Sequence, residues 1–383
     1  MSVPRVLHVA SWYPSPEDPV FGTFVREHIR AAGEVSSGEV LHLRRSSRVA
    51  GAGSGSGIDD VPPGIRLEVG RGPLSFGRGV IAARGPVKEM EVRNGRYDLI
   101  HAHSVSVAPA AIALARARRI PVVLSEHWSA FRAGRPTEIP RVLWPVMRAS
   151  FRVADIVLPV SESLASGIRS FAPRTAIRVI PNVVGTTVFN RGGRSARSLG
   201  DEVVVLTASN LVANKRVDDV VHAVASAGRR DGRVRLVIAG DGPERSALEQ
   251  LTSTLGIRDR VSFLGQVPKE ELARSMREAS VFVLASEFET FSVVCAEALA
   301  CGLPVVATRS GGPDGFVDDR SGTIVSVGDV EALAEAIDES ILRSWDHESI
   351  ARAAASRFSS SVVAAALGDV YRDVLGQEAG RWS

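Results

Sequence analysis

Residues 281–304 read VFVLASEFETFSVVCAEALACGLP, and this stretch decides the fold. Its first four residues are a continuous apolar run typical of a buried strand, and residues 293–300 predict an apolar helix that the closing Gly-Leu-Pro ends. Glu289 is therefore expected on the loop between strand and helix, and Glu297 inside the helix. In an open α/β sheet such a loop lies at the carboxyl end of a strand, where ligands bind and helix N–H groups face an anion.

Two carboxylate acceptors beside an anion site suit a hydroxyl-rich phosphate ester. The alternative, two solvated carboxylates on a surface helix, is disfavoured by the apolar residues around Glu297. The flanks of the pair are specific too: Glu289 begins Glu-Thr-Phe-Ser, Glu297 begins Glu-Ala-Leu-Ala-Cys-Gly-Leu-Pro, and Gly-Gly-Pro follows at residues 311–313. The segment resembles the nucleotide-sugar site of retaining glycosyltransferases of family 4, which carry two glutamates separated by seven residues.

This resemblance extends over nearly the whole chain, and the second half matches best. It implies the α/β GT-B fold, in which two Rossmann-like, doubly wound domains face a central cleft. The sequence pattern agrees, because short β-rich runs alternate with helical patterns twice over. The predicted strands are residues 5–10, 40–43, 65–69, 98–102, 122–125, 156–159 and 177–180 in the first half, and 203–207, 234–239, 261–264, 281–284, 305–308 and 323–325 in the second.

The predicted domains are an acceptor-binding domain over residues 1–190 and a nucleotide-sugar-binding domain over residues 191–369. The polar stretch 181–195 has no periodicity and predicts the linker. The C-terminal helices around residues 359–375 resemble the return helix of the family, which packs on the first domain, and the predicted domains assign this helix to about residues 370–383. A glycine-rich run at residues 48–57 opens no helix and predicts a surface loop rather than a phosphate cradle.

Composition limits the functional classes. The 383 residues suffice for two cores, and a net charge of +3 is too small to argue for a nucleic-acid partner. No apolar run of about 18 residues appears, and the first residues lack a signal-peptide layout. The two cysteines lack metal or redox spacing. We expect a cytoplasmic protein, and the excess of arginine leaves open a peripheral position at the inner face of a membrane.

A basic stretch at residues 131–135, followed by Arg141 and Arg148, suits an anionic acceptor or a membrane surface. A solvated basic face is the alternative. The sequence alone leaves this choice open.

Further donor-site candidates follow other strands of the second half. Lys215 precedes a predicted helix and can reach a diphosphate, and it matches the phosphate-binding lysine of the family. A plain surface lysine is the alternative. Where many relatives have Gly-Arg, this chain has Ser-Asn ending at Asn210, so a second cation is either missing or replaced by Arg216. Gly240 and Gly242 resemble a family Gly-Asp-Gly-Pro motif, and either a nucleotide contact or a purely architectural turn explains them.

The resemblance also assigns roles around the glutamate pair. It places Glu289 near the hydroxyls of the donor sugar and Glu297 on the ribose hydroxyls. The backbone N–H groups at the helix start would then face the diphosphate and the sugar. These groups belong to Phe291, Ser292 and Val293.

The first half supplies three candidates. Gly22 resembles a family glycine that lets backbone approach the phosphates, with a glycine that relieves crowding as the alternative. His101 and His103 point the same way from one strand end, without a third ligand at metal-ligand spacing. The resemblance makes His103 an active-site histidine that hydrogen-bonds the donor sugar and leaves His101 to packing. His127 is a candidate acceptor-side group, with a structural role as the alternative.

We predict a retaining hexosyltransferase that moves a sugar from a UDP- or GDP-sugar to a hydroxyl of a glycan, glycolipid or small metabolite. Glu289, Lys215 and His103 are the predicted catalytic residues, and retention is implied by the resemblance. In the mechanism commonly proposed for such enzymes, the donor phosphate takes the acceptor proton. Because no Asp-x-Asp motif is evident, neither a metal nor another cofactor is expected. The alternatives are a nucleotide-sugar epimerase of the same fold and a non-catalytic nucleotide-sugar sensor.

Overall fold

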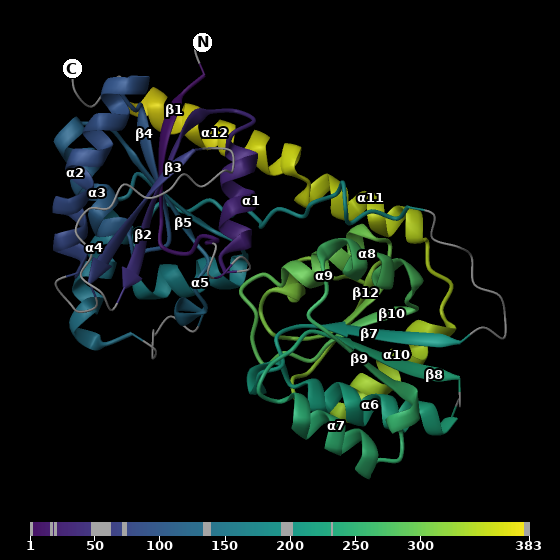
Figure 1. Ribbon diagram of the computed structural model, residues 1–383. Helices are drawn as coiled ribbons and strands as arrows, with labels where there is room; N and C mark the ends of the chain where they lie inside the picture. Colours follow the sequence, from purple (N-terminus) through teal and green to yellow (C-terminus); the bar gives the residue numbers. More distant parts are fainter. Residues whose placement is uncertain are drawn as a thin grey trace. The chain divides into compact units, whose positions relative to one another are not determined.

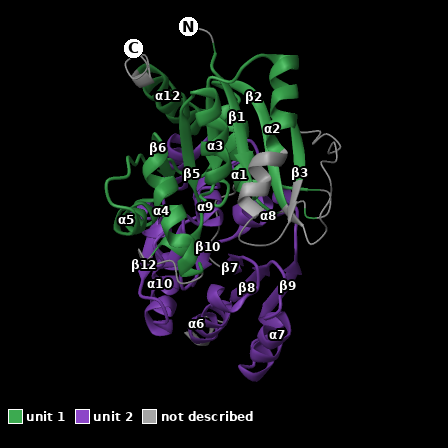
Figure 2. Cartoon of the chain, turned by 90° about the vertical axis from the view of Figure 1, so that its left-hand side faces the viewer, with its two compact units in different colours: residues 1–183, 360–383 green, residues 184–359 purple. Residues whose placement is uncertain are grey.

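The computed structural model describes residues 3–15, 18, 21–46, 63–70, 75–132, 139–192, 202–230 and 233–378. The chain divides into two compact units, shown in Figure 2. Unit 1 consists of residues 1–183 and 360–383, and unit 2 consists of residues 184–359. The predicted glycine-rich loop at residues 48–57 and the last residues of the predicted linker, 193–195, lie outside the described residues.

Unit 1 is built on a parallel six-stranded sheet in the order β3-β2-β1-β4-β5-β6. Helices α1 and α12 pack against each other, and α3 packs between α2 and α4 (Figure 1). The strands are β1 (Arg5–Ala10), β2 (Ser37–Ser46), β3 (Gly64–Gly70), β4 (Leu99–His103), β5 (Val122–Glu126) and β6 (Ile156–Pro159). The helices are α1 (Thr23–Ala32), α2 (Ser75–Asn94), α3 (Ala108–Arg118), α4 (Trp144–Val153), α5 (Glu162–Phe171) and α12 (Ser360–Glu378), with 3-10 turns η1 (Ser129–Phe131) and η2 (Arg141–Leu143).

Unit 2 repeats this plan with the strand order β12-β11-β10-β7-β8-β9. Helix α6 packs against α7 and α10, whereas α9 packs against α8 and α11. The strands are β7 (Val203–Ala208), β8 (Val234–Ala239), β9 (Val261–Gly265), β10 (Val281–Leu284), β11 (Val305–Thr308) and β12 (Gly322–Val325). The helices are α6 (Val217–Arg230), α7 (Arg245–Thr254), α8 (Lys269–Glu278), α9 (Val293–Ala300), α10 (Val330–Leu342) and α11 (His347–Phe358), with 3-10 turns η3 (Ala213–Lys215), η4 (Arg258–Arg260) and η5 (Pro313–Gly315).

The predicted doubly wound sheets are confirmed. Strands β10 and β11 are fully buried four-residue runs, as expected where helices cover both faces of a parallel sheet. Helix α9 has the predicted bounds, because Gly302 adopts a φ of 72° and closes a Schellman motif. In that motif the Gly302 N–H donates to the Leu299 carbonyl and the Leu303 N–H to the Ala298 carbonyl.

The predicted strand at residues 177–180 is wrong. This segment runs beside β6, and the Val157 N–H donates to the Ala176 carbonyl at 2.8 Å. The Arg178 and Ile180 N–H groups also donate to the Val157 and Pro159 carbonyls at 3.0 and 3.1 Å, but the only bridge among the described residues here is the isolated one between Val157 and Ile177. Pro159 lacks the N–H that the next pair of a parallel ladder needs, which explains why no strand continues.

The unit boundaries differ from the predicted domain boundaries after residues 190 and 369. The chain passes between the units after Val183 and again after Ser359. The Val184 N–H donates to the Phe358 carbonyl at 2.8 Å, so the two connections lie next to each other. Helix α12 begins at Ser360, earlier than the predicted return helix. It joins the core of unit 1 through Val363, Leu367, Val370, Tyr371 and Val374. None of the described helices is both long and apolar enough to cross a membrane.

Candidate active site

Three polar side chains meet at the carboxyl ends of β7 and β10 in unit 2. The Lys215 Nζ lies 2.6 Å from Glu289 Oε1, and the Ser286 hydroxyl donates to the same oxygen at 2.9 Å. Lys215 comes from η3, whereas Glu289 and Ser286 come from the loop after β10. The Glu289 N–H donates to the Ser310 carbonyl at 2.8 Å, and the Thr308 hydroxyl donates to the Ser286 carbonyl at 2.6 Å. The loop that carries Glu289 is thus fastened to the end of β11.

The start of α9 lies on the same loop. Its N-cap residue Ser292 has a φ of 70°, a left-handed conformation that costs a non-glycine residue about 1 kcal/mol. The Ser292 side chain does not cap the helix. The first N–H groups of a helix have no intrahelical acceptor. The helix start therefore offers polar hydrogens to an anionic group.

Phe291 holds this helix start in place. Its ring packs against those of Phe316 and Phe358, with centroids 5.2 and 5.4 Å away. A Cβ on Gly312 would lie 2.6 Å from the Phe291 carbonyl, which explains the glycine in the Gly-Gly-Pro sequence. The predicted backbone candidates Phe291, Ser292 and Val293 are therefore kept at one position by packing.

Glu297 lies inside α9 as predicted and is only 9% exposed. The charges of Glu289, Lys215 and Glu297 reach the Cys295 thiol, whose pKa is raised to about 12, chiefly by burial. Cys295 and Cys301 are buried and are not joined by a disulfide, in accord with the predicted packing role. The two glutamates and the lysine thus gather around the first turns of one helix.

The two glycines of the Gly-Asp-Gly-Pro motif allow two backbones to touch. Gly240 has a φ of 125°, and a Cβ there would lie 1.9 Å from the Ser209 carbonyl oxygen. A Cβ on Gly242 would lie 2.4 Å from the Leu211 carbonyl oxygen. This close contact favours the architectural explanation and also sets the position of the loop that carries Asn210.

Asn210, which stands where many relatives have arginine, and Arg216, the candidate replacement cation, differ in their surroundings. Asn210 is exposed at the end of β7. Arg216 instead donates to both carboxylate oxygens of Asp219, at 2.7 and 3.1 Å. This pairing, the largest cause, raises the pKa of Arg216. Arg216 is therefore directed toward the first turn of α6, and Lys215 is the better-placed cation beside Glu289.

In unit 1, Gly22 caps α1 with a φ of 72°. A Cβ on Gly22 would lie 2.4 Å from the carbonyl carbon of Trp12 and 2.6 Å from the Tyr13 nitrogen. The start of α1 thus packs directly on the loop after β1. Close packing within the chain already accounts for this glycine.

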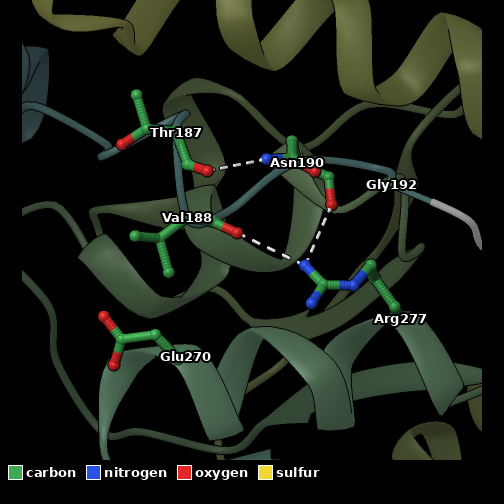
Figure 3. A pocket seen from close by; sticks show the side chains of 6 residues that line it. All are labelled: Thr187, Val188, Asn190, Gly192, Glu270 and Arg277. Carbon is green, nitrogen blue, oxygen red and sulfur yellow. Dashed lines mark hydrogen bonds between the residues drawn. The ribbon is translucent and has the colours of Figure 1, made fainter.

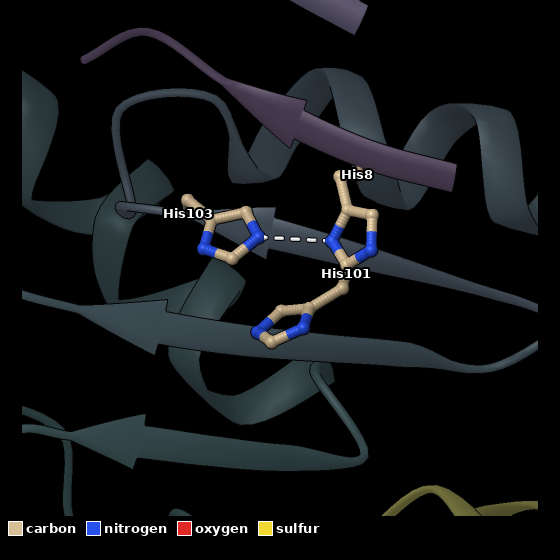
Figure 4. Close-up of side chains that lie close together, drawn as sticks. All are labelled: His8, His101 and His103. Carbon is tan, nitrogen blue, oxygen red and sulfur yellow. Dashed lines mark hydrogen bonds between the residues drawn. The ribbon is translucent and has the colours of Figure 1, made fainter. Parts of the chain in front are cut away.

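Three histidines stack in the sheet of unit 1 (Figure 4). The His8 Nδ1 lies 3.1 Å from His103 Nε2, and the His101 and His103 rings stack with centroids 4.2 Å apart. The ring nitrogens of His101 contact the Tyr371 hydroxyl at 2.7 Å and the Ser125 hydroxyl at 2.8 Å. Burial lowers the pKa of His8 to about 3 and holds the pKa values of His101 and His103 well below the usual range.

One nitrogen from each of these three histidines lies within 4.8 Å of the other two, which is metal-ligand proximity. However, both nitrogens of His101 already have hydrogen-bond partners, so this trio fits a neutral packing cluster better than a metal centre. His101 packs as predicted. His103 is fully buried, and its Nδ1 forms no hydrogen bond within the described residues. His8 was not foreseen, because it joins the others through the pairing of β1 with β4.

Glu126 connects the two loops next to these histidines. Its Oε2 accepts from the Val105 N–H at 2.7 Å, and its Oε1 accepts from the His127 and Trp128 N–H groups at 2.9 Å. Burial raises the pKa of Glu126 to about 7, although the three hydrogen bonds oppose this shift. Ser104, directly after His103, has a φ of 98°. Glu126 adjoins His127 at the predicted ligand edge and was a candidate acceptor-side group with it, but these three hydrogen bonds give it a structural role.

His127 is buried, and its ring packs against Phe24 and His28, with centroids 5.0 and 5.3 Å away. Burial holds the pKa of His127 well below its usual range. A neutral, packed ring favours the structural alternative over contact with an acceptor.

A hollow of about 380 Å³ in unit 2 contains none of the predicted site residues (Figure 3). The Arg277 guanidinium crosses it and donates to the Val188 and Asn190 carbonyls at 3.3 and 3.5 Å. The remaining lining residues are Thr187, Gly192 and Glu270. Arg277 thus anchors the first residues of unit 2 to α8, which gives this hollow a structural explanation.

Comparison with known proteins agrees with this geometry. Residues 194–357 match the profile of group 1 glycosyl transferases, and residues 47–188 match that of glycosyltransferase family 4. A D-inositol 3-phosphate glycosyltransferase of Saccharomonospora viridis is 33% identical over 307 residues, which cover 73% of this chain and 71% of that protein. A GDP-mannose-dependent alpha-(1-6)-phosphatidylinositol monomannoside mannosyltransferase of Mycolicibacterium smegmatis is 32% identical over 265 residues, covering 63% and 67%.

Solved structures share the fold. Sucrose-phosphate synthase from Thermosynechococcus elongatus has a TM-score of 0.74 at 21% identity and covers 97% of this chain and 100% of its own. Anabaena HepE in complex with UDP and glucose has a TM-score of 0.72 at 19% identity, with coverage of 97% and 100%. The arrangement of two parallel α/β sheets in series is that of the GT-B fold.

Proposed function

The chain belongs to glycosyltransferase family 4, and from this membership we propose that it transfers a sugar from a UDP- or GDP-sugar to an acceptor hydroxyl with retention of anomeric configuration. That it is a glycosyltransferase of group 1 follows from the family. The nucleotide, the stereochemistry, the acceptor and the residue roles are the proposed parts. A cytoplasmic location, with a peripheral position at a membrane, belongs to the same proposal.

The observation that carries the proposal is the Lys215–Glu289 pair beside the start of α9. Sugar transfer builds negative charge on the departing nucleoside diphosphate, and a lysine with helix N–H groups stabilises such charge. Lys215 is 22% exposed at its side chain and Glu289 12%, so both remain reachable by a ligand. We assign Lys215 and the α9 N–H groups to the diphosphate.

Glu289 is assigned to the hydroxyls of the donor sugar. Its Oε1 already accepts from Lys215 and Ser286, so this carboxylate is fixed in one orientation. A fixed carboxylate suits hydrogen bonding to hydroxyls rather than free movement as a base. We therefore propose that the acceptor hydroxyl attacks on the face of the leaving group, where the donor phosphate takes its proton. Glu297, buried in α9, is assigned to the ribose.

Relatives point to both candidate nucleotides and to hydroxyl-rich acceptors. The mannosyltransferase from Mycolicibacterium smegmatis is GDP-mannose-dependent, whereas the HepE structure holds UDP and glucose. The acceptors in the names of two relatives are an inositol phosphate and a phosphatidylinositol mannoside. A polyol or a polyol-bearing lipid is therefore the first acceptor class to test.

Binding and turnover test the proposal in sequence. The melting temperature is measured with UDP, GDP and their common sugar conjugates, because a ligand that binds the folded state raises it. Donors that bind are then incubated with inositol phosphates, and the product anomer is assigned by NMR. Binding of one nucleotide class and a product that keeps the donor configuration are expected. Release of an altered nucleotide sugar without acceptor would instead indicate an epimerase, and binding without any turnover would indicate a sensor.

A further inference from the structure

An apolar stripe runs along the outside of η2 and α4 in unit 1. Val142, Val146 and Val153 have exposed fractions of 77%, 48% and 41%. Val142 and Val146 are four residues apart, and Ala149, also exposed, continues the same helix face toward Val153. A single exposed valine is ordinary, but several aligned on one helix face are not. The opposite face supplies the buried residues Met147, Ser150 and Phe151.

A row of arginines lies beside this stripe. Arg141, Arg148 and Arg152 recur at intervals of seven and four residues, so they share a second face of the same segment. The guanidinium groups of Arg141 and Arg148 each lie 5.7 Å from the Trp144 ring centroid. Arg148 also donates through Nε to the Phe171 carbonyl at 2.9 Å and lies 4.8 Å from the Phe171 ring centroid, so its guanidinium is held in place beside the valines. Residues 139–154 contain no aspartate or glutamate.

The row ends at a surface hollow of about 510 Å³. Arg152 and Arg174 line it together with Pro173. Neither arginine has an acidic partner within the described residues, whereas Arg169 on α5 pairs with Glu162. Two unneutralised guanidinium groups at a hollow suit a phosphate group.

We propose that this face, made of Arg141, Val142, Val146, Arg148, Arg152 and Val153, binds the surface of an anionic lipid bilayer. An amphipathic helix at an interface buries its apolar stripe at the acyl boundary and places its arginines at the lipid phosphates. The hollow at Arg152 and Arg174 receives one head-group phosphate. Trp144, between Arg141 and Arg148, suits the same interfacial depth.

A second copy of the chain is a poorer occupant of this face. In a two-fold dimer the same patch meets itself, so the arginines of both copies would enter one interface to which residues 139–154 contribute no aspartate or glutamate. The face also lies close in sequence to the ligand-binding edge of the sheet. Segment η2 comes after β5 and η1, and ligands bind at the carboxyl ends of the strands in open α/β folds. The inference rests on the peripheral membrane position proposed above and names the surface that makes the contact. Vesicle binding is measured without a donor or acceptor, so its failure is distinguishable from a failure of sugar transfer.

Co-sedimentation of the full chain with lipid vesicles tests this proposal. Vesicles of phosphatidylcholine alone are compared with vesicles that also contain phosphatidylglycerol, at low and high salt. Binding only to the anionic vesicles, weakened by salt, is expected. The double variant Arg141→Glu and Arg152→Glu should lower the partition coefficient by at least twentyfold, because each charge near the surface contributes about fivefold. Val146→Gln with Val153→Gln should also lower it, by about tenfold.

Matched controls use residues of unit 1 outside the face. Val92→Gln replaces a 79% exposed valine on α2, and Arg116→Glu reverses an exposed charge on α3. Both should bind vesicles like the unaltered chain, and circular dichroism checks that every variant is folded. Equal binding to neutral vesicles, no binding to anionic ones, or equal losses in the controls would overturn the proposal. A dimer in light scattering that Val146→Gln with Val153→Gln dissociates would assign the face to self-association instead.

Discussion

Lys215 and Glu289 form an ion pair of 2.6 Å that joins η3 to the loop after β10, so each charge is partly neutralised by the other. The pair holds two neighbouring strand ends together at the start of α9. Under the proposed function, the departing diphosphate would meet a lysine that this ion pair already holds in position. Proximity of this kind is what preorganised charge stabilisation requires.

Lys215→Ala is expected to lower kcat/KM by about a hundredfold, or roughly 3 kcal/mol, because the charge on the leaving diphosphate loses its cation. The melting temperature should change little, since an ion pair with partly exposed partners contributes about 1 kcal/mol or less. A donor-consumption assay measures the effect, with Lys88→Ala on α2 as the control. Turnover close to that of the unaltered chain would remove Lys215 from the catalytic set.

Glu289→Gln tests the other member of the pair. The amide keeps the size of the side chain but loses the charge, so we expect a loss of about a hundredfold in kcat/KM with the fold retained. If both residues act on one transition state, the double variant should lose less than the product of the single losses. Strictly multiplicative losses in the donor-consumption assay would show that the two act independently.

Glu126→Ala should destabilise unit 1. The substitution leaves the N–H groups of Val105, His127 and Trp128 without their shared acceptor, and each buried unsatisfied donor costs about 1–3 kcal/mol. We expect a melting temperature lower by at least about 6 °C. Differential scanning calorimetry measures it, with the exposed Glu89→Ala on α2 as the control. Equal melting temperatures for the two variants would contradict the role assigned to Glu126.

Gly22→Ala should also destabilise unit 1. A Cβ there meets the Trp12 carbonyl carbon at 2.4 Å, and a φ of 72° is strained for alanine. Gly376→Ala is the matched control, because nothing lies within 4 Å of its Cβ position in the last turn of α12. The control should gain up to about 1 kcal/mol from helix propensity. Chemical unfolding should therefore move the two variants in opposite directions, and a stable Gly22→Ala chain would show that the contact relaxes freely.

The sequence predicted the fold well where local chemistry is decisive. Residues 281–284 and 293–300 form β10 and α9 as expected, because a continuous apolar run and a Gly-Leu-Pro stop leave few alternatives. The failure at residues 177–180 has a non-local cause, since it follows from the missing N–H of Pro159 on the adjacent strand β6. That proline was visible, but its neighbour in the sheet was not.

The site was harder to predict, because its contacts join residues far apart in the chain. Local patterns identified Lys215 and Glu289 separately, but their pairing depends on β7 lying beside β10. The capture of Arg216 by Asp219 depends on side-chain orientation rather than on spacing. His8 faces His101 only because of the register between β1 and β4.

The buried histidines of unit 1 make its stability depend on pH. Burial lowers the pKa of His8 to about 3 and that of His28 to about 4 in the folded chain, whereas the unfolded value is about 6.5. Between these values the unfolded chain binds more protons. The free energy of unfolding is therefore highest above pH 6.5, where these histidines are neutral in both states. It falls as the pH drops below 6.5, because only the unfolded chain then takes up the protons.

Urea unfolding at pH 7.5 and pH 5 should consequently show a large fall in the free energy of unfolding. At pH 5 the loss amounts to about 2 kcal/mol for each of His8 and His28. The exposed His222 on α6 serves as the control, because His222→Gln should leave the difference between the two pH values unchanged. A free energy of unfolding that stays constant between pH 7.5 and pH 5 would mean that these rings are protonated, or reach water, in the folded chain.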